Sequence, residues 1–176
     1  MPRLKLRKTN IMRIIEESLN RISCPANVHI SVESSLQDES LWVDSEHMID
    51  ILSELEKNSL EAMPDGGLLI IQVKEDEGKV CIALTDTGRG IAEKDRNHLL
   101  EPFFTTKPPG EGIGLGLPSA YAFVKSYRGD FSIESNADPQ KGKTGTTIRI
   151  SLPRKMILPD KQAKIIIHDD EEKSAN

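Results

Sequence analysis

Glycines alternate with other residues in the run Gly110-Glu111-Gly112-Ile113-Gly114-Leu115-Gly116-Leu117, which leads directly into an apolar segment with helical spacing. Glycine loses more backbone freedom on folding than any other residue, so such a run is expected where the chain needs positive φ angles or very close backbone approach. The first N–H groups of a helix lack intrahelical partners and bind anions. The run therefore has two interpretations: a phosphate-binding turn at a helix start, or a flexible glycine-rich surface loop.

The residues around this run do not fit two common phosphate-binding motifs. No Gly-Lys-Ser or Gly-Lys-Thr follows it, as a Walker loop requires, and a Rossmann fingerprint requires a strand directly before its glycines. Here the residues Lys-Pro-Pro-Gly-Glu of segment 107–111 stand in that place. A phosphate group at this turn is therefore expected to be bound in another way.

Composition limits the chain to one domain and argues against several partners. Its 176 residues, 37% of them hydrophobic, suffice for a single buried core. A formal net charge of −5 and the absence of a long basic run argue against a nucleic-acid surface. No stretch approaches the roughly 20 apolar residues of a transmembrane helix, and residues 1–8 lack the apolar core of a signal peptide. We expect a soluble, cytoplasmic chain without membrane contact.

The two cysteines, Cys24 and Cys81, are far apart in the sequence, lack the spacing of metal ligands and have apolar neighbours. This pattern favours buried free thiols over a disulfide or a metal site. Free thiols also fit a reducing cytoplasm.

Hydrophobic periodicity predicts alternating helices and strands along the chain. The helices are expected at 9–22, with Thr9 or Asn10 as cap, at 44–63, with Asp44 or Ser45 as cap, and at 117–127, with a short helix or turn at 91–100. The strands are expected at 28–33, 41–43, 68–73, 79–85, 130–135 and 145–153, those at 68–73 and 79–85 forming a hairpin. The expected divisions are a lead-in at 1–8, the domain at 9–153, and a linker with an acidic tail at 154–176.

Two polar patterns are candidate sites. Glu54 and Asn58 lie one turn apart on the long predicted helix and point the same way, although a solvated helix face has the same pattern. Asp86 ends a predicted strand and is followed by Gly88 and Gly90. A carboxylate in that position can accept a hydrogen bond from an exocyclic amine while the glycines admit a flat ring, but an ordinary Asp-x-Gly turn also fits.

The segment Phe103-Phe104-Thr105-Thr106-Lys107 has two adjacent aromatic residues in a chain with only 4% aromatics. We expect the phenylalanines to pack on the core and fix the loop, which leaves Thr105, Thr106 and Lys107 free to face a ligand. The following residues, 108–111, are a candidate for a flexible lid.

Taken together, these four motifs resemble the N, first-glycine, F and second-glycine boxes of the histidine-kinase ATP-binding domain, in that order and spacing. They are Glu54-x-x-x-Asn58, Asp86-x-Gly88-x-Gly90, 103–107 and 112–117. The resemblance covers residues 9–153, includes Gly145-Thr146-Thr147, and extends to the GHKL superfamily. It implies the Bergerat fold, an α/β (α+β) two-layer sandwich with a mixed, mainly antiparallel sheet covered on one face by helices.

The resemblance also implies ATP and Mg²⁺ as cofactors and assigns roles to residues. Asn58 would ligate Mg²⁺, Asp86 would bind the adenine amine, and Thr146 would support Asp86 or an adenine-bound water. Glu54, Asn58 and Lys107 would be the catalytic residues, with Glu54 either a general base or a positioning residue. The implied nucleotide contacts are Asn58, Glu61, Ala62, Asp86, Gly88, Gly90, Ile91, Thr105, Thr106, Lys107, Gly112, Ile113, Gly114, Leu115, Gly116, Leu117 and Thr146.

A histidine kinase phosphorylates a histidine in a helical His-Glu/Asp-x-x-Asn/Thr setting, which none of the four histidines has: His29, His47, His98 and His168. The resemblance therefore implies a histidine-bearing dimerisation domain on another segment or chain, and a response regulator or receiver domain as partner. We expect this chain to be monomeric without that dimerisation domain.

Segment 163–171 resembles the first strand and acidic pocket of a receiver domain, as in a hybrid kinase, although a charged disordered tail is an equal alternative. Asp169 and Asp170 are not counted as a metal site. Two other functions remain open: a GHKL-type ATPase with Glu54 as general base, and an anti-sigma-like regulatory module.

Overall fold

The computed structural model describes residues 5–108, 110, 112–154 and 166–167. Its helices are α1 (Ile11–Asn20), α2 (Ser45–Glu61) and α3 (Gly116–Ser126), with 3-10 helices η1 (Glu93–His98) and η2 (Pro139–Lys141). Its strands are β1 (Lys5–Asn10), β2 (Val28–Ser34), β3 (Ser40–Val43), β4 (Gly67–Asp76), β5 (Lys79–Asp86), β6 (Asp130–Asn136), β7 (Gly145–Pro153) and β8 (Ile166–Ile167). Each predicted helix and strand corresponds to one of these elements.

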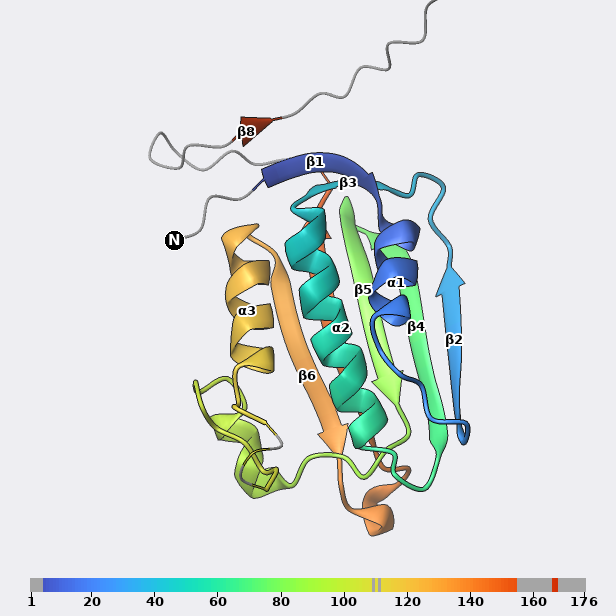
Figure 1. Ribbon diagram of the computed structural model, residues 1–176, viewed down its shortest axis with the longest axis vertical. Coiled ribbons are helices and arrows are strands. Elements are labelled where there is room, and N and C mark those ends of the chain that lie inside the picture. Colours follow the sequence, from blue (N-terminus) through green and yellow to red (C-terminus); the bar gives the residue numbers. More distant parts are fainter. Residues whose placement is uncertain (1–4, 109, 111, 155–165, 168–176) are drawn as a thin grey trace, which may run out of the picture.

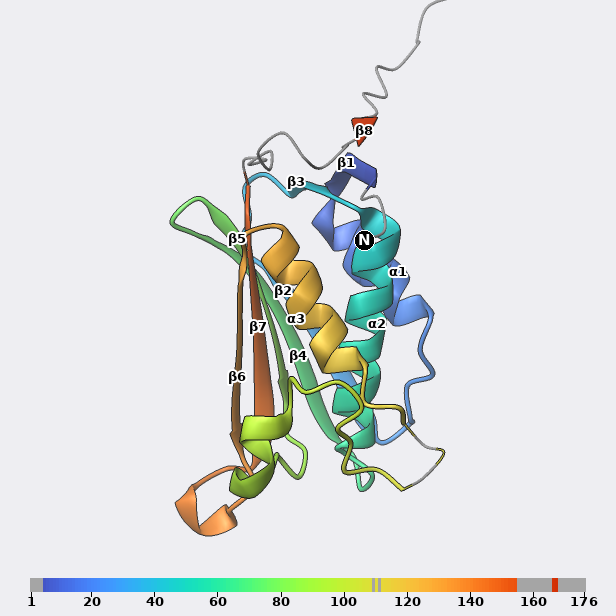
Figure 2. The ribbon, with the colours of Figure 1, turned by 90° about the vertical axis from the view of Figure 1, so that its left-hand side faces the viewer.

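The main sheet has five strands in the order β2-β4-β5-β7-β6. The β2–β4 pair is parallel, whereas β4–β5, β5–β7 and β6–β7 are antiparallel. All three α-helices of the described residues lie on one face of this sheet, and in this part of the chain the opposite face carries none (Figure 2). The implied two-layer sandwich with a mixed, mainly antiparallel sheet is therefore confirmed.

The core lies between the sheet and the helices. Along β5, residues alternate between buried side chains, such as Ile82 and Leu84, and half-exposed ones on the other face. Leu52 and Leu55 of α2 are fully buried against the same side. This period of two on the strand and the helical spacing on α2 are the patterns from which the elements were predicted.

Side chains cap the first two helices as the sequence predicts. The Asn10 side chain accepts hydrogen bonds from the backbone N–H groups of Met12 and Arg13, at 2.8 and 3.1 Å, so α1 begins at Ile11 rather than at residue 9. Asp44 accepts from the N–H of His47 at 3.3 Å and caps α2. Each cap satisfies N–H groups that a helix cannot satisfy itself.

The sequence pattern did not predict strand β1. It pairs antiparallel with β3 through residues from Arg7 to Asn10, and Lys5 and Leu6 pair in parallel with β8 (Figure 1). Leu6 is buried, but its neighbours are exposed lysines and arginines, so the segment has no local signal beyond one alternation. Apart from β8, the receiver-like segment 163–171, with Asp169 and Asp170, lies outside the described residues.

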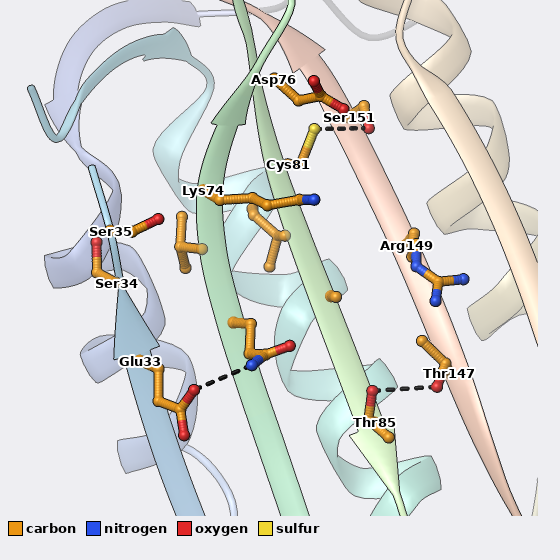
Figure 3. A pocket seen from close by; sticks show the side chains of 14 residues that line it. Glu33, Ser34, Ser35, Lys74, Asp76, Cys81, Thr85, Thr147, Arg149 and Ser151 are labelled. Atoms are coloured by element: carbon orange, nitrogen blue, oxygen red, sulfur yellow. Dashed lines mark hydrogen bonds between the residues drawn. The ribbon is translucent and has the colours of Figure 1, made fainter. Parts of the chain in front are cut away.

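The prediction that both cysteines are buried is wrong, although both are free. Cys24 is exposed in the connection between α1 and β2, and Cys81 is half-buried on the helix-free face of the sheet. The apolar neighbours of Cys81 on β5 point into the core, on the opposite side of the sheet. On the helix-free face a cavity of about 550 Å³ is lined by Cys81, hydroxyl groups, and charged side chains of both signs, among them Lys74 and Arg149 (Figure 3).

Within the described part of the chain, no helix has the length and apolar character needed to cross a membrane.

Candidate functional site

Three of the four predicted motifs converge where the C-terminal half of α2 meets the start of α3, and the fourth lies at the adjacent end of β5. In Figure 1 the loop between η1 and α3 runs below α3 and beside the lower end of α2. Asp86 is the last residue of β5 and pairs in register with Thr146 of β7. Residues of these motifs that are far apart in the sequence are therefore neighbours at this end of the sheet and helices.

Glu54 and Asn58 both face the start of α3. A Cβ atom added to Gly116 would lie 3.4 Å from Asn58 Nδ2 and 3.7 Å from Glu54 Oε2. The N-cap residue of α3, Leu115, makes no side-chain cap hydrogen bond among the described residues. The first N–H groups of α3 therefore lie beside Asn58 without a side-chain acceptor, as an anion site requires.

Lys107 reaches across to α2. Its ammonium group donates a hydrogen bond to Asn58 Oδ1 at 2.9 Å and forms an ion pair with Glu61. The oxygen that the resemblance assigns to a metal ion thus already faces a cation. An amide oxygen is a ligand that Mg²⁺ accepts, and Mg²⁺ commonly takes its other ligands from phosphates and water.

No cluster of three or more histidine, cysteine, aspartate or glutamate side chains suited to a metal ion exists among the residues that the structure describes. A metal ion held by many protein ligands therefore does not fit this site. The amide oxygen of Asn58 would suit a Mg²⁺ ion that takes its remaining ligands from phosphates and water.

Asp86 is buried, with 5% of its surface exposed, and its orientation is set by the backbone. Its Oδ1 accepts hydrogen bonds from the N–H groups of Gly88 at 2.9 Å and Thr146 at 3.2 Å. Burial raises the pKa of the Asp86 carboxyl, while these two donors and the Ser59 hydroxyl act against that rise. The result is a fixed carboxylate at a strand end, suited to accept a hydrogen bond from an amine.

Two serines near Asp86 were not predicted from the sequence. Ser59 is almost fully buried, and Ser135 links three segments. The Ser135 hydroxyl accepts from the Ile91 N–H at 2.8 Å, donates to the Gly145 carbonyl at 2.9 Å, and lies 2.9 Å from Thr146 Oγ1. The period of two on β6 and its register with β7, which pairs Ser135 with Thr146, could have identified the second serine only if strand pairing were known.

Gly88 and Gly90 allow backbone segments to approach one another. A Cβ atom on Gly88 would lie 2.6 Å from the Ala62 carbonyl oxygen at the end of α2, and one on Gly90 would lie 2.0 Å from the Asn136 carbonyl oxygen. Gly90 also has a φ of +70°. The predicted role of these glycines, bordering a flat ring, stays a prediction, but the structure gives a second reason for both.

The glycine run folds onto the loop that precedes it. Gly114 has a φ of +66°, and a Cβ atom there would lie 2.4 Å from the Phe104 carbonyl oxygen. The Phe103 N–H donates to the Gly114 carbonyl at 3.0 Å. Backbone contact with the phenylalanine segment therefore explains Gly114 without any ligand.

The prediction that both phenylalanines anchor this loop on the core is wrong for Phe103. This side chain is 75% exposed, and its φ of +69° turns it away from the protein. Phe104 is half-buried, and its ring centroid lies 5.5 Å from that of His98. The residue spacing carries no signal for a left-handed conformation at a non-glycine residue.

The other predicted contacts lie around this centre with different exposure. Thr105 and Thr106 are exposed, and Thr105 Oγ1 accepts the Lys107 N–H at 3.1 Å. Ile113 is 71% exposed. Half-buried residues are Ala62, Ile91, Gly112, Leu115 and Leu117. Pro109 and Glu111 of the predicted lid lie outside the described residues.

The model of one protein family, described as histidine kinase-, DNA gyrase B-, and HSP90-like ATPase, matches residues 43–156. The chain belongs to this family, and the resemblance drawn from the four motifs is confirmed.

Two curated relatives are kinases. Sporulation kinase A of Bacillus subtilis is 34% identical over 149 residues, which are 83% of this chain and 23% of that protein. The sensor histidine kinase ZraS of Escherichia coli K12 is 30% identical over 162 residues, 90% of this chain and 33% of that protein. The chain thus spans a third or less of the length of these relatives.

Solved structures agree with the fold. The mycobacterial sensor histidine kinase MprB superimposes with a TM-score of 0.72 at 26% identity, covering 85% of this chain and 98% of that one. Full-length ShkA in complex with AMPPNP gives a TM-score of 0.73 at 19% identity, covering 90% of this chain and 33% of that one. The histidine kinase ThkA in complex with the response regulator TrrA superimposes with a TM-score of 0.67 at 19% identity, covering 86% of this chain and 42% of that one.

Proposed function

We propose that the chain is the catalytic, ATP-binding domain of a sensor histidine kinase of a two-component system, located in the cytoplasm. It transfers the γ-phosphoryl group of ATP to a histidine on another domain or chain. The observation that carries this proposal is the convergence of Glu54, Asn58 and Lys107 at the uncapped start of α3. Asp86 lies at the adjacent end of β5.

Each side chain has a role that its position supports. Asp86 accepts a hydrogen bond from the adenine amine, and Thr146 and Ser59 hold the Asp86 carboxylate in place. Asn58 supplies the amide oxygen for Mg²⁺, which neutralises phosphate charge when bound. The N–H groups at Gly116 and Leu117 face the phosphates. Glu54 orients the phosphoryl group or the attacking histidine.

The partners follow from the site and the relatives. His29 lies on strand β2, His47 packs on Phe123, and His98 contacts Glu101. None has the setting of an acceptor, so the acceptor belongs to a dimerisation domain. The complex of ThkA with a response regulator supports a receiver domain as the next partner. The isolated chain is a monomer.

Titration with a non-hydrolysable ATP analogue, with and without Mg²⁺, tests the proposal. Asp86→Asn should weaken analogue binding roughly 10- to 100-fold, because it removes the charged carboxylate that accepts the hydrogen bond from the adenine amine. Asn58→Ala should abolish the Mg²⁺ dependence. Asp65→Asn, at an exposed turn, is the control and should bind normally. Absence of binding by the folded wild-type domain would contradict the proposal.

An ATPase is the second candidate, because Glu54 Oε2 faces the start of α3 beside Asn58. Phosphate release by the chain alone that disappears in Glu54→Ala would favour it. Phosphotransfer only after addition of a histidine-bearing partner supports the kinase. Stable capture of a partner without phosphotransfer would indicate an anti-sigma-like regulatory module.

A further inference from the structure

Lys107 compensates an unfavourable charge at the end of α2. Glu61 is the last residue of this helix, whose final turn contains no basic residue. The carbonyl end of a helix carries partial negative charge, so a carboxylate there is unfavourable and a cation is stabilising. The Lys107 ammonium supplies that cation from another segment, and its side chain is only 25% exposed.

The same ammonium contacts Asn58. The Lys107 Nζ atom lies 2.9 Å from Asn58 Oδ1 and also donates to the carboxylate of Glu61, one turn further along α2. Asn58 and Glu61 are three residues apart and therefore share one face. The cation is thus held between an amide oxygen and a carboxylate, a donor set that also suits a hard metal ion and its bound water.

The backbone also fixes Lys107. Its N–H donates to Thr105 Oγ1 at 3.1 Å, and a Cβ atom on Gly112 would lie 2.9 Å from Lys107 Cδ. The absence of a side chain at Gly112 is what lets the glycine run lie against the lysine stem. The position of the ammonium is therefore tied to the segment that leads into α3.

We infer that Lys107 is the resident cation of the metal position in the nucleotide-free domain, and that Glu61 is the positioning residue that holds it there. This inference rests on the proposed function, because only a nucleotide brings a metal ion to Asn58. Two cations on one amide oxygen repel strongly, so Lys107 must leave Asn58 when a metal ion binds. Asn58 itself lies beside the start of α3, so an ammonium released from Asn58 would be available to phosphates bound there.

Competition between the two cations predicts two opposite effects of Lys107→Met. The Mg²⁺ concentration that gives half-maximal analogue binding falls about 3- to 10-fold, because the competitor is gone. Analogue binding in excess chelator weakens by a similar factor, because the Lys107 ammonium no longer attracts the phosphates. If Lys107 only stabilised the structure, its loss would weaken both the binding of Mg²⁺ and the binding of the analogue in chelator.

Glu61→Gln isolates the positioning role, since it keeps Lys107 and the shape of the site. Its half-saturating Mg²⁺ concentration falls, as in Lys107→Met, because the ammonium is held less firmly at Asn58. Lys94→Met, on the exposed η1 helix, is the matched control and changes neither quantity. An unchanged Mg²⁺ midpoint in Glu61→Gln would overturn the inference, because it would show that Glu61 does not hold Lys107 at Asn58. A higher midpoint would also overturn it, because it would make Glu61 a partner of the metal ion rather than of Lys107.

A measurement without nucleotide separates this inference from the proposed function. In acetylation by an N-hydroxysuccinimide ester, followed by mass spectrometry, Lys107 of the wild type reacts more slowly than Lys94, and Glu61→Gln accelerates it several-fold. Equal Lys107 rates in wild type and variant would overturn the positioning role. A protected Lys107 in a wild type that binds no analogue would instead overturn the proposed function.

Discussion

At the scale of the residue, two buried carboxyl groups show how surroundings decide charge. Asp86 has backbone donors that favour its ionised form. Glu56 of α2 is fully buried, and its Oε1 lies 2.7 Å from Ser18 Oγ, which also lies 2.9 Å from the Ile15 carbonyl oxygen. The single hydroxyl hydrogen of Ser18 serves both acceptors, and Glu56 Oε2 has no hydrogen-bond partner among the described residues. Burial therefore favours the protonated form of Glu56 in the folded domain.

This protonation makes stability depend on pH. Burial raises the pKa of Glu56 from 4.5 to about 7, so the stabilising contribution is complete below pH 4.5 and is lost as pH rises through 7. The loss amounts to about 3 kcal/mol of unfolding free energy at pH 8. Glu56→Gln, whose amide can donate to Ser18, should remove this loss and be more stable than the wild type at pH 8.

Urea unfolding at pH 5 and pH 8 measures the effect as the difference between wild type and variant. Glu17→Gln, at an exposed position on α1, is the control and should change with pH as the wild type does. A Glu56→Gln variant with the same pH dependence as the wild type would show that folding does not raise the pKa of Glu56.

At the scale of the element, the start of α3 is shaped by contacts that a glycine run does not reveal. Gly110 and Gly114 both have positive φ angles, of +93° and +66°. Within 4 Å of a Cβ atom on Gly110 there is nothing among the described residues, whereas one on Gly114 meets the Phe104 backbone. The two glycines are alike in conformation and differ in crowding.

Alanine at these two positions should therefore act differently. Gly110→Ala bears only the left-handed strain, about 1–2 kcal/mol, in a loop. Gly114→Ala also separates the glycine run from the phenylalanine segment and breaks the bond from the Phe103 N–H. Amide hydrogen exchange at Phe103 should rise about tenfold or more in Gly114→Ala and little in Gly110→Ala. Equal exchange in both variants would contradict the close packing of this turn.

At the scale of the whole molecule, α2 connects two ends with different tasks. Its start lies beside β3, where the Asp44 N–H donates to the Tyr127 hydroxyl at 2.9 Å, and its end lies at the candidate site (Figure 1). At the first of these ends Arg154, directly after β7, donates to the Ser40 carbonyl at 2.8 Å and to Glu75 at 2.7 Å. Its side chain is 18% exposed.

Removal of Arg154 should affect stability and spare the site. Arg154→Ala should lower the free energy of unfolding by about 1–2 kcal/mol, because it leaves a carbonyl and a carboxylate without their charged donor. Nucleotide affinity should stay unchanged, since the site is at the other end of α2. Arg149→Ala, whose guanidinium pairs with Glu134 on the exposed sheet face, is the control and should cost less than about 0.5 kcal/mol. Equal losses in the two variants would contradict this difference.

The sequence by itself determined the three α-helices and most of the strands in the described part of the chain, and the family. Local patterns are sufficient for this, because side chains repeat with the period of the helix or strand that buries them, and because the caps Asn10 and Asp44 act within three residues. The four motifs also predicted most residues of the candidate site, since each box is a short segment, but they did not include Ser59 and Ser135.

The tertiary structure alone decided what those residues contact. Nothing in the spacing shows that Lys107 reaches Asn58 and Glu61, 49 and 46 residues away, or that Glu56 finds Ser18 at a distance of 38 residues. The exposure of Phe103 and the strand β1 also depend on backbone conformation and on pairing with distant segments. Such contacts form only when the sheet and helices have packed, so the charge of Glu56 and the cation at Asn58 are properties of the folded domain.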